Sequence, residues 1–265
     1  MSHQSQKQAA NCLMLACSYG ACFETCKRDA MLPLTICANR ATCLLQNLYC
    51  DGHGAPGIKK TADTRDQELF QITTSGKRIP IQEFSCIIIN IFMPLDLPKI
   101  LQSDVNSFSP FPPYSRSMLS EIIKNQGELM SAIKSYKSWL KIFDKSYLKN
   151  PIYYLANPFT TLFKENTNNT KQDIAKIGKC LHNVTKIMYD EYGIDLILPD
   201  ANMLCNGLYV REHFGQIDRY RDWKTLHASK PAGRDPIHKN KIYGERMYSI
   251  IKDRISATSS HGKLL

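Results

Sequence analysis

Motifs that identify most enzyme classes are missing from this sequence. It has no Cys-x-x-Cys pair, no His-Glu-x-x-His, no Gly-x-Ser-x-Gly elbow and no recognisable pair of glycosidase carboxylates. The segment Gly52–Thr61 approaches a phosphate-binding loop, but Ile58 breaks the Gly-Lys-Ser/Thr ending that such a loop requires. We therefore expect no metal site and no cofactor.

Long hydrophobic runs are missing as well. The longest, Cys86–Met93, is interrupted by Asn90 and falls far short of the ~20 residues that cross a bilayer. Only Lys7 supplies positive charge ahead of the apolar stretch Ala9–Leu15, which argues against a cleaved signal. We expect no transmembrane segment and a cytoplasmic site of action.

The chain has the composition of a globular protein and an excess of positive charge. Of its 265 residues 43% are hydrophobic and 22% charged, and the net charge is +10, spread along the sequence. Such an excess suits an acidic protein partner, an anionic membrane surface or nucleic acid. No basic motif interleaved with aromatic residues is present, which disfavours nucleic acid.

Ten cysteines are present, several of them four or five residues apart near the N-terminus. Cys22 and Cys26 have the spacing of neighbours on a helix and could share a metal ion. Without Cys-x-x-Cys pairs or histidines at ligand spacing, the pattern favours reduced, buried thiols in a cytosolic protein.

Periodicity predicts an all-α helical bundle. The segment Phe84–Met93 is compatible with a buried strand because Ile87, Ile88 and Ile89 are β-branched, but the spacing of Phe84, Ile87, Ile88 and Ile91 favours a helix. We expect a helical domain over residues 1–148 and a helical C-terminal extension over 149–265. A long polar connection is expected over 50–80 and a short amphipathic segment over Ile100–Phe108. Helices are expected over Gln4–Glu24, Leu32–Tyr49, Met118–Tyr136, Lys137–Leu148, Asp173–Tyr192 and 240–255.

The order of motifs within residues 30–140 resembles that of a known family. An acid precedes an apolar segment, a proline elbow follows, and an amphipathic segment carrying an aromatic residue comes next. The corresponding residues are Gln82-Glu83-Phe84-Ser85-Cys86, Ile87–Met93, Asp96-Leu97-Pro98 and Leu101–Val105 with Phe108. This order resembles the vacuolar protein sorting nine domain of Rabex-type exchange factors, which act on endosomal Rab GTPases.

The resemblance implies guanine-nucleotide exchange, with GDP release promoted by an acidic finger rather than by covalent chemistry. The finger of the family falls on Gln82, and the nearest acid is Glu83, so Glu83 is the expected finger and Gln82 its rival. A carboxylate placed at the nucleotide's phosphates would weaken their hold on magnesium. The resemblance also implies a GTPase-binding groove formed by Cys86, Ile87, Asn90, Lys124 and Asn125.

A second resemblance, to Rho GTPase-activating domains, keeps an alternative open. There the arginine finger corresponds to Lys60 and a later asparagine to Tyr154, which implies a non-catalytic GTPase binder. A basic scaffold protein is the remaining alternative. The Lys-, Ile- and Asn-rich composition suggests a bacterial virulence effector that acts at host endosomal membranes during vesicle trafficking.

Overall fold

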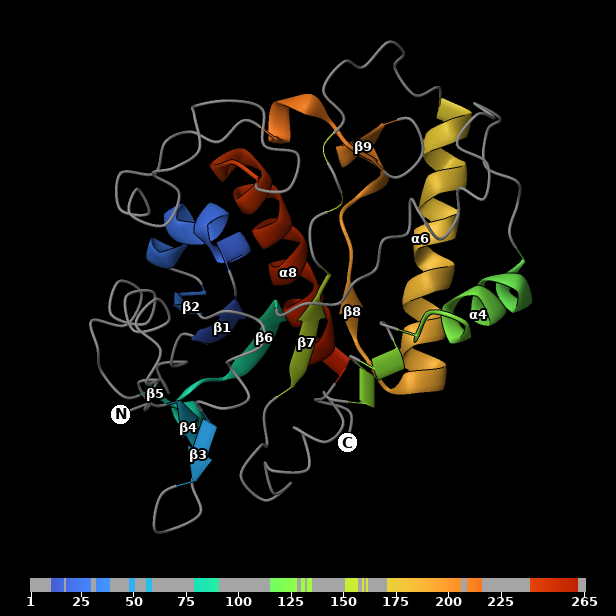
Figure 1. Ribbon diagram of the computed structural model, residues 1–265. Coiled ribbons are helices and arrows are strands. Elements are labelled where there is room, and N and C mark those ends of the chain that lie inside the picture. Colours follow the sequence, from blue (N-terminus) through green and yellow to red (C-terminus); the bar gives the residue numbers. More distant parts are fainter. Residues whose placement is uncertain are drawn as a thin grey trace, which may run out of the picture.

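A central parallel sheet flanked by helices organises the part of the chain that the computed structural model describes (Figure 1). The described residues are 11–16, 18–29, 32–38, 48–50, 56–58, 79–90, 115–127, 130–131, 133–134, 151–156, 159, 161, 171–205, 209–215 and 239–261.

The five strands of this sheet are all parallel and lie in the order β2-β1-β6-β7-β8. Strand β2 follows β1 toward one edge, whereas β6, β7 and β8 extend toward the other, so the strand order reverses between β1 and β6. A doubly wound sheet has its topological switch point at such a reversal. The strands are β1 (Cys12–Ala16), β2 (Leu34–Ala38), β6 (Cys86–Asn90), β7 (Ile152–Leu155) and β8 (Leu196–Ile197).

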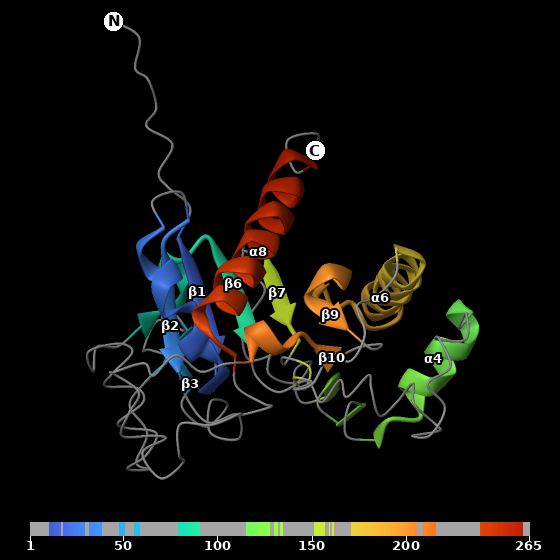
Figure 2. The same cartoon turned by 90° about the horizontal axis from the view of Figure 1, so that it is seen from above.

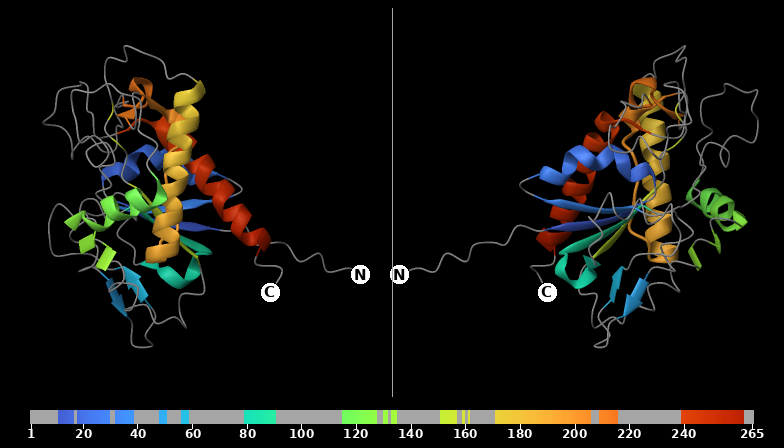
Figure 3. Two further views of the ribbon diagram at one scale, coloured as in Figure 1. Left: turned by 90° about the vertical axis from the view of Figure 1, so that its right-hand side faces the viewer. Right: turned by 60° about the vertical axis from the view of Figure 1, so that its left-hand side comes forward.

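Helices lie on both sides of the sheet (Figures 2 and 3). The 3-10 helix η1 (Ser18–Arg28) packs against α8 (Lys241–His261) on one side. Helix α4 (Arg116–Lys124) packs against α6 (Lys171–Tyr192) on the other. A helix layer on each side explains why the strands are apolar on both faces.

Two small antiparallel sheets and three short 3-10 helices complete the described elements. Strand β4 pairs with both β3 and β5, and β9 pairs with β10. Their bounds are β3 (Leu48–Cys50), β4 (Pro56–Ile58), β5 (Ile79–Pro80), η2 (Ile81–Glu83), η3 (Ala201–Met203), β9 (Leu204–Cys205), β10 (Tyr209–Val210) and η4 (Glu212–Phe214).

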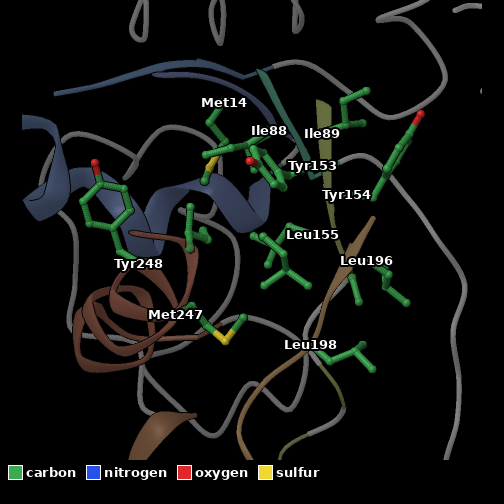
Figure 4. Close-up of a cluster of buried hydrophobic side chains, with 14 of the residues drawn as sticks. Met14, Ile88, Ile89, Tyr153, Tyr154, Leu155, Leu196, Leu198, Met247 and Tyr248 are labelled. Carbon is green, nitrogen blue, oxygen red and sulfur yellow. The ribbon is translucent and has the colours of Figure 1, made fainter. Parts of the chain in front are cut away.

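The core forms where the sheet meets its helices. Met14, Ile88 and Tyr153 are register partners across β1, β6 and β7, and they lie toward α8, whereas Tyr154 points to the other side (Figure 4). All five residues of β1 and all five of β6 are buried. Full burial of each large apolar side chain contributes about 1.5–3 kcal/mol.

Polar contacts fix α8 against the segment around η1. Lys252 Nζ lies 2.6 Å from Asp29 Oδ2, and the Tyr248 hydroxyl donates a hydrogen bond to the Leu32 carbonyl. Gly244 allows the two helices to approach closely, because a Cβ atom there would overlap the carbonyl oxygen of Cys22.

The all-α expectation is wrong, because the described elements form a mixed α/β fold. The segment expected as a helix over Phe84–Met93 contains strand β6, and those expected over Gln4–Glu24 and Leu32–Tyr49 contain β1 and β2. A strand buried on both faces is apolar at every position, so it satisfies a helical spacing by default. The expected connection over 50–80 contains strands β4 and β5.

The predictions of amphipathic helices agree better with the structure than those of the buried segments. Helix α6 confirms the prediction over Asp173–Tyr192, α8 that over 240–255, and α4 matches the first part of that over Met118–Tyr136. The amphipathic segment expected over Ile100–Phe108 and the helix expected over Lys137–Leu148 lie outside the described residues. Among the residues that the structure describes, no helix is long and apolar enough to cross a membrane.

The seven cysteines whose side chains the structure describes divide into two groups. Cys12 and Cys86, register partners at the starts of β1 and β6, form a disulfide, so the expectation of reduced thiols is wrong for this pair. It is confirmed for five buried cysteines that are in no disulfide, which are Cys22, Cys26, Cys37, Cys180 and Cys205.

Gly178 in α6 and Gly244 in α8 should respond oppositely to alanine. Gly244→Ala forces α8 away from Cys22 and should lower the free energy of unfolding by about 1–3 kcal/mol or more. Gly178→Ala meets only Ala201 Cβ at 3.9 Å and should raise it by about 0.5–1 kcal/mol. Urea unfolding measures both, and equal effects would contradict the described packing of α8 on η1.

The Cys12–Cys86 disulfide closes a loop with a sequence separation of 74 residues. In the chain-entropy model, its loss in the double variant Cys12→Ala/Cys86→Ala should reduce the free energy of unfolding by about 4 kcal/mol. Cys180→Ala, which removes a free buried thiol, is the control and should cost much less. Peptide mapping without reductant that finds both thiols free would refute the pairing.

Candidate functional site

The carboxyl ends of β1 and β6 form the candidate site. In open parallel sheets, ligands bind outside the carboxyl ends of the strands at the switch point, where the chain leaves neighbouring strands toward opposite faces. Here η1 follows β1 on the α8 side of the sheet, whereas α4, the next described helix after β6, lies on the opposite side (Figure 3). Ala16 ends β1 and lies in register with Asn90, which ends β6.

Asn90 is the unusual residue at this position. Only 1% of its surface is exposed, and neither its side-chain nitrogen nor its side-chain oxygen has a hydrogen-bond partner. Leaving one buried polar group unpaired costs about 1–3 kcal/mol, and native proteins rarely do so without a reason. An amide carries two donor hydrogens and an acceptor oxygen, so the full hydrogen-bonding capacity of this side chain is unused.

A second buried asparagine shows what satisfaction looks like in the same molecule. Asn240 is 3% exposed, and its Nδ2 donates to the His213 carbonyl at 2.6 Å. Its Oδ1 accepts from the backbone N–H of Tyr243 at 3.1 Å and so caps the start of α8. Asn240 therefore has a structural role that Asn90 lacks.

Two more buried hydroxyls without partners belong to β7 and the chain after it. Because strand side chains alternate, Tyr153, the register partner of Ile88, shares the sheet face of Asn90, and its hydroxyl has no hydrogen-bond partner. Thr161, six residues beyond the end of β7, also has an unpartnered hydroxyl and lies over Gly215. Of the four described residues with unpartnered buried side-chain groups, three thus come from β6, β7 and the chain after β7, and the fourth, Tyr192, ends α6.

The start of η1 packs tightly on the end of β1. A Cβ atom at Gly20 would lie 2.6 Å from the Cβ of Ala16, so only glycine lets the first turn of η1 approach this closely. Small residues at Ala16 and Gly20 thus bring the backbone of η1 close to the end of β1, whose last residue is the register partner of Asn90. Close approach of backbone to a bound group is one use of glycine at the first turn of such folds.

Chemically activated groups are scarce in the described part of the chain. Burial raises the pKa of Cys37 to about 12 and that of Cys180 to about 11, so both thiols stay protonated and unreactive near neutral pH. Burial also raises the pKa of Tyr154 to about 12. No group of three or more His, Cys, Asp or Glu side chains that could hold a metal ion occurs among the described residues. The arrangement is suited to binding by hydrogen bonds.

The residues expected as the acidic finger and those expected to form the GTPase-binding groove lie in separate places. Glu83, in η2, is exposed at the amino-terminal end of β6, where Asn11 Nδ2 donates to its carbonyl at 3.1 Å. Its rival Gln82 lies in the same short helix. Cys86 and Ile87 are buried within the sheet, Cys86 in the disulfide.

The remaining members of the expected groove lie at other places in the fold. Asn90 lies at the opposite end of β6, about 13 Å along the strand from Cys86 at ~3.3 Å per residue. Lys124 and Asn125 are exposed at the end of α4, where Lys124 pairs with Glu121 at 3.0 Å. In the alternative set, Tyr154 is buried in β7, and Lys60 lies outside the described residues.

Known proteins offer no guide to this site. No family model, curated protein or solved structure matches the chain. Sequence reasoning selected Asn90 as part of a helical groove and missed Tyr153 and Thr161. The available signal was Asn90 itself, a polar residue that interrupts an otherwise apolar, β-branched run.

Proposed function

We propose that the protein binds a small polar ligand at the carboxyl ends of β1 and β6, and that the Asn90 amide contacts it. The observation that carries this proposal is the amide itself, which is buried, wholly unpartnered and placed at the topological switch point. A bound molecule with an adjacent donor and acceptor would satisfy both ends of the amide at once.

Nucleotides are the ligand class that fits these features best. A nucleobase edge presents a donor and an acceptor side by side, which an asparagine side chain can engage through two hydrogen bonds. The negative charge of a phosphate suits a protein with a net charge of +10. Anionic metabolites without a nucleobase would be attracted by the positive charge of the protein but would not pair with both ends of the Asn90 amide.

Guanine-nucleotide exchange on endosomal Rab GTPases, at host membranes or elsewhere, stays a prediction of the sequence resemblance. The described residues do not form the helical groove that this exchange activity would require, because Glu83 precedes strand β6 and Asn90 lies at its other end. We therefore favour the binding of a small ligand at the end of the sheet over guanine-nucleotide exchange on Rab GTPases.

Replacing Asn90 should separate stability from binding. Asn90→Leu removes an unpaired buried amide while keeping a similar side-chain volume, so it should raise the free energy of unfolding of the ligand-free protein by about 1–3 kcal/mol. In a thermal-unfolding panel of nucleoside mono-, di- and triphosphates, wild type should be stabilised by at least one member. A ligand present at 100 times its Kd should contribute about 2.7 kcal/mol, and Asn90→Leu should lose this response.

Two further variants sharpen the test. Asn125→Leu changes an exposed asparagine on α4 and should keep the ligand response of wild type. Tyr153→Phe removes the unpartnered Tyr153 hydroxyl without changing packing, so the ligand-free variant should be at least as stable as wild type. A wild type that responds to no nucleotide, or an Asn90→Leu variant that responds unchanged, would overturn the proposal.

A further inference from the structure

A groove of about 420 Å³ lies at the β8 edge of the sheet, away from the switch point. Its walls come from helices on the two sides of the sheet, with Leu181 and Thr185 from α6 and Ile250 from α8. Its floor is the chain of β8 and the residues after it, including Leu196 and Leu198. Figure 3, left, faces this edge and shows α6 and α8 beside it.

The backbone of β8 presents one side to β7 and the other to this groove. Tyr154 N–H donates to the Asp195 carbonyl at 2.9 Å, and Ala156 N–H donates to the Ile197 carbonyl at 3.2 Å. Backbone groups alternate in direction along a strand, so the N–H and C=O of Leu196 point away from β7. No described strand pairs with β8 on that outer side.

Two ion pairs hold the α8 wall in place along this edge. Arg254 lies 2.7 Å from Asp195, just before β8, and Arg246 lies 3.1 Å from Asp200, just after it. Ile250 stands midway between the two arginines on the same face of α8. The groove is therefore bounded at both ends by contacts that keep the helix at a fixed distance from the strand.

The opposite rim is basic. Lys179, His182 and Lys186 are exposed on α6 at the i, i+3, i+7 spacing that places them on one stripe, and His182 also lines the groove. Both arginines on the α8 side are already paired with aspartates. Among the described residues beside the groove, Lys179 and Lys186 on the α6 rim carry positive charge that no described carboxylate pairs with, and this charge would attract acidic side chains.

We propose that an acidic, extended peptide segment of a partner protein adds to β8 as a further strand. Its backbone would pair with the outward-facing groups of β8, and its apolar side chains would lie between α6 and α8. Acidic residues beside them would face the stripe of Lys179, His182 and Lys186. Strand addition to a sheet edge is an established mode of peptide recognition, in which backbone bonds give affinity and side-chain pockets give specificity.

A library selection followed by backbone methylation tests this directly. A phage-displayed library of random peptides of about 12 residues is panned against the full chain, and the recovered peptides are synthesised. We expect acidic sequences with alternating apolar residues. N-methylation at every second amide should abolish binding in one register and leave it nearly unchanged in the other, because only alternate N–H groups face β8.

Groove-filling variants locate the binding surface. Thr185→Trp places a bulky side chain in the groove and should weaken the peptides by at least about tenfold. Ser256→Trp, on an exposed position of α8 outside the groove, is the matched control and should bind like wild type. Circular dichroism checks that both variants fold.

The proposal is overturned if the selection yields no enriched peptide. It is equally overturned if the recovered peptides bind Thr185→Trp as well as wild type, or tolerate methylation in both registers. Peptides that lose affinity only when their side chains change would indicate a helix or an irregular segment in the groove instead of a strand.

Discussion

Strand β6 is the constraint on which the rest of the fold depends. It lies between β1 and β7, pairs with both, and buries all five of its residues. No position in it can therefore satisfy its backbone groups with water, and pairing with two neighbours replaces that solvent. Its run of isoleucines suits this environment, because β-branched side chains pack well on a pleated surface. The disulfide from Cys86 to Cys12 fixes the same register covalently at the start of the strand.

The position of β6 also determines where a ligand can meet the sheet. With β2 on one side of β1 and β6 on the other, the strand order reverses between the two central strands, and ligands of open parallel sheets bind outside the carboxyl ends of the strands at such a point. A polar residue at the end of β6 is then buried among groups that cannot pair with it. The contrast with Asn240, whose amide caps a helix and binds a carbonyl, makes structural necessity a poor explanation for Asn90. The edge of the sheet at β8 offers a different kind of surface, backbone rather than side chain, because the sheet ends there between two helices.

The sequence allowed the helices to be predicted but not the sheet. Helices α6 and α8 each have one face on the core and one in water, so their apolar residues follow a helical period that can be read directly. Strands β1 and β6 are covered by helices on both faces, and an uninterrupted apolar run carries no period that distinguishes strand from helix. The resemblance to helical exchange factors used the same apolar run, so it depended on the same choice between strand and helix. Asn90 was recognisable as a polar interruption, yet its role depends on which strand lies beside it, and Tyr153 and Thr161 depend on pairings that local pattern does not contain.

Whether residues 86–90 form a strand between two parallel neighbours can be measured by NMR on protein with labelled amides and isoleucine methyl groups. We expect extended-chain Cα and Cβ shifts over Cys86–Asn90, together with cross-strand contacts from Ile88 to both Met14 and Tyr153. Helical shifts with strong sequential amide contacts over the same residues, and no contact to Met14 or Tyr153, would contradict it. In that case the switch point, and the ligand site at Asn90, would not exist.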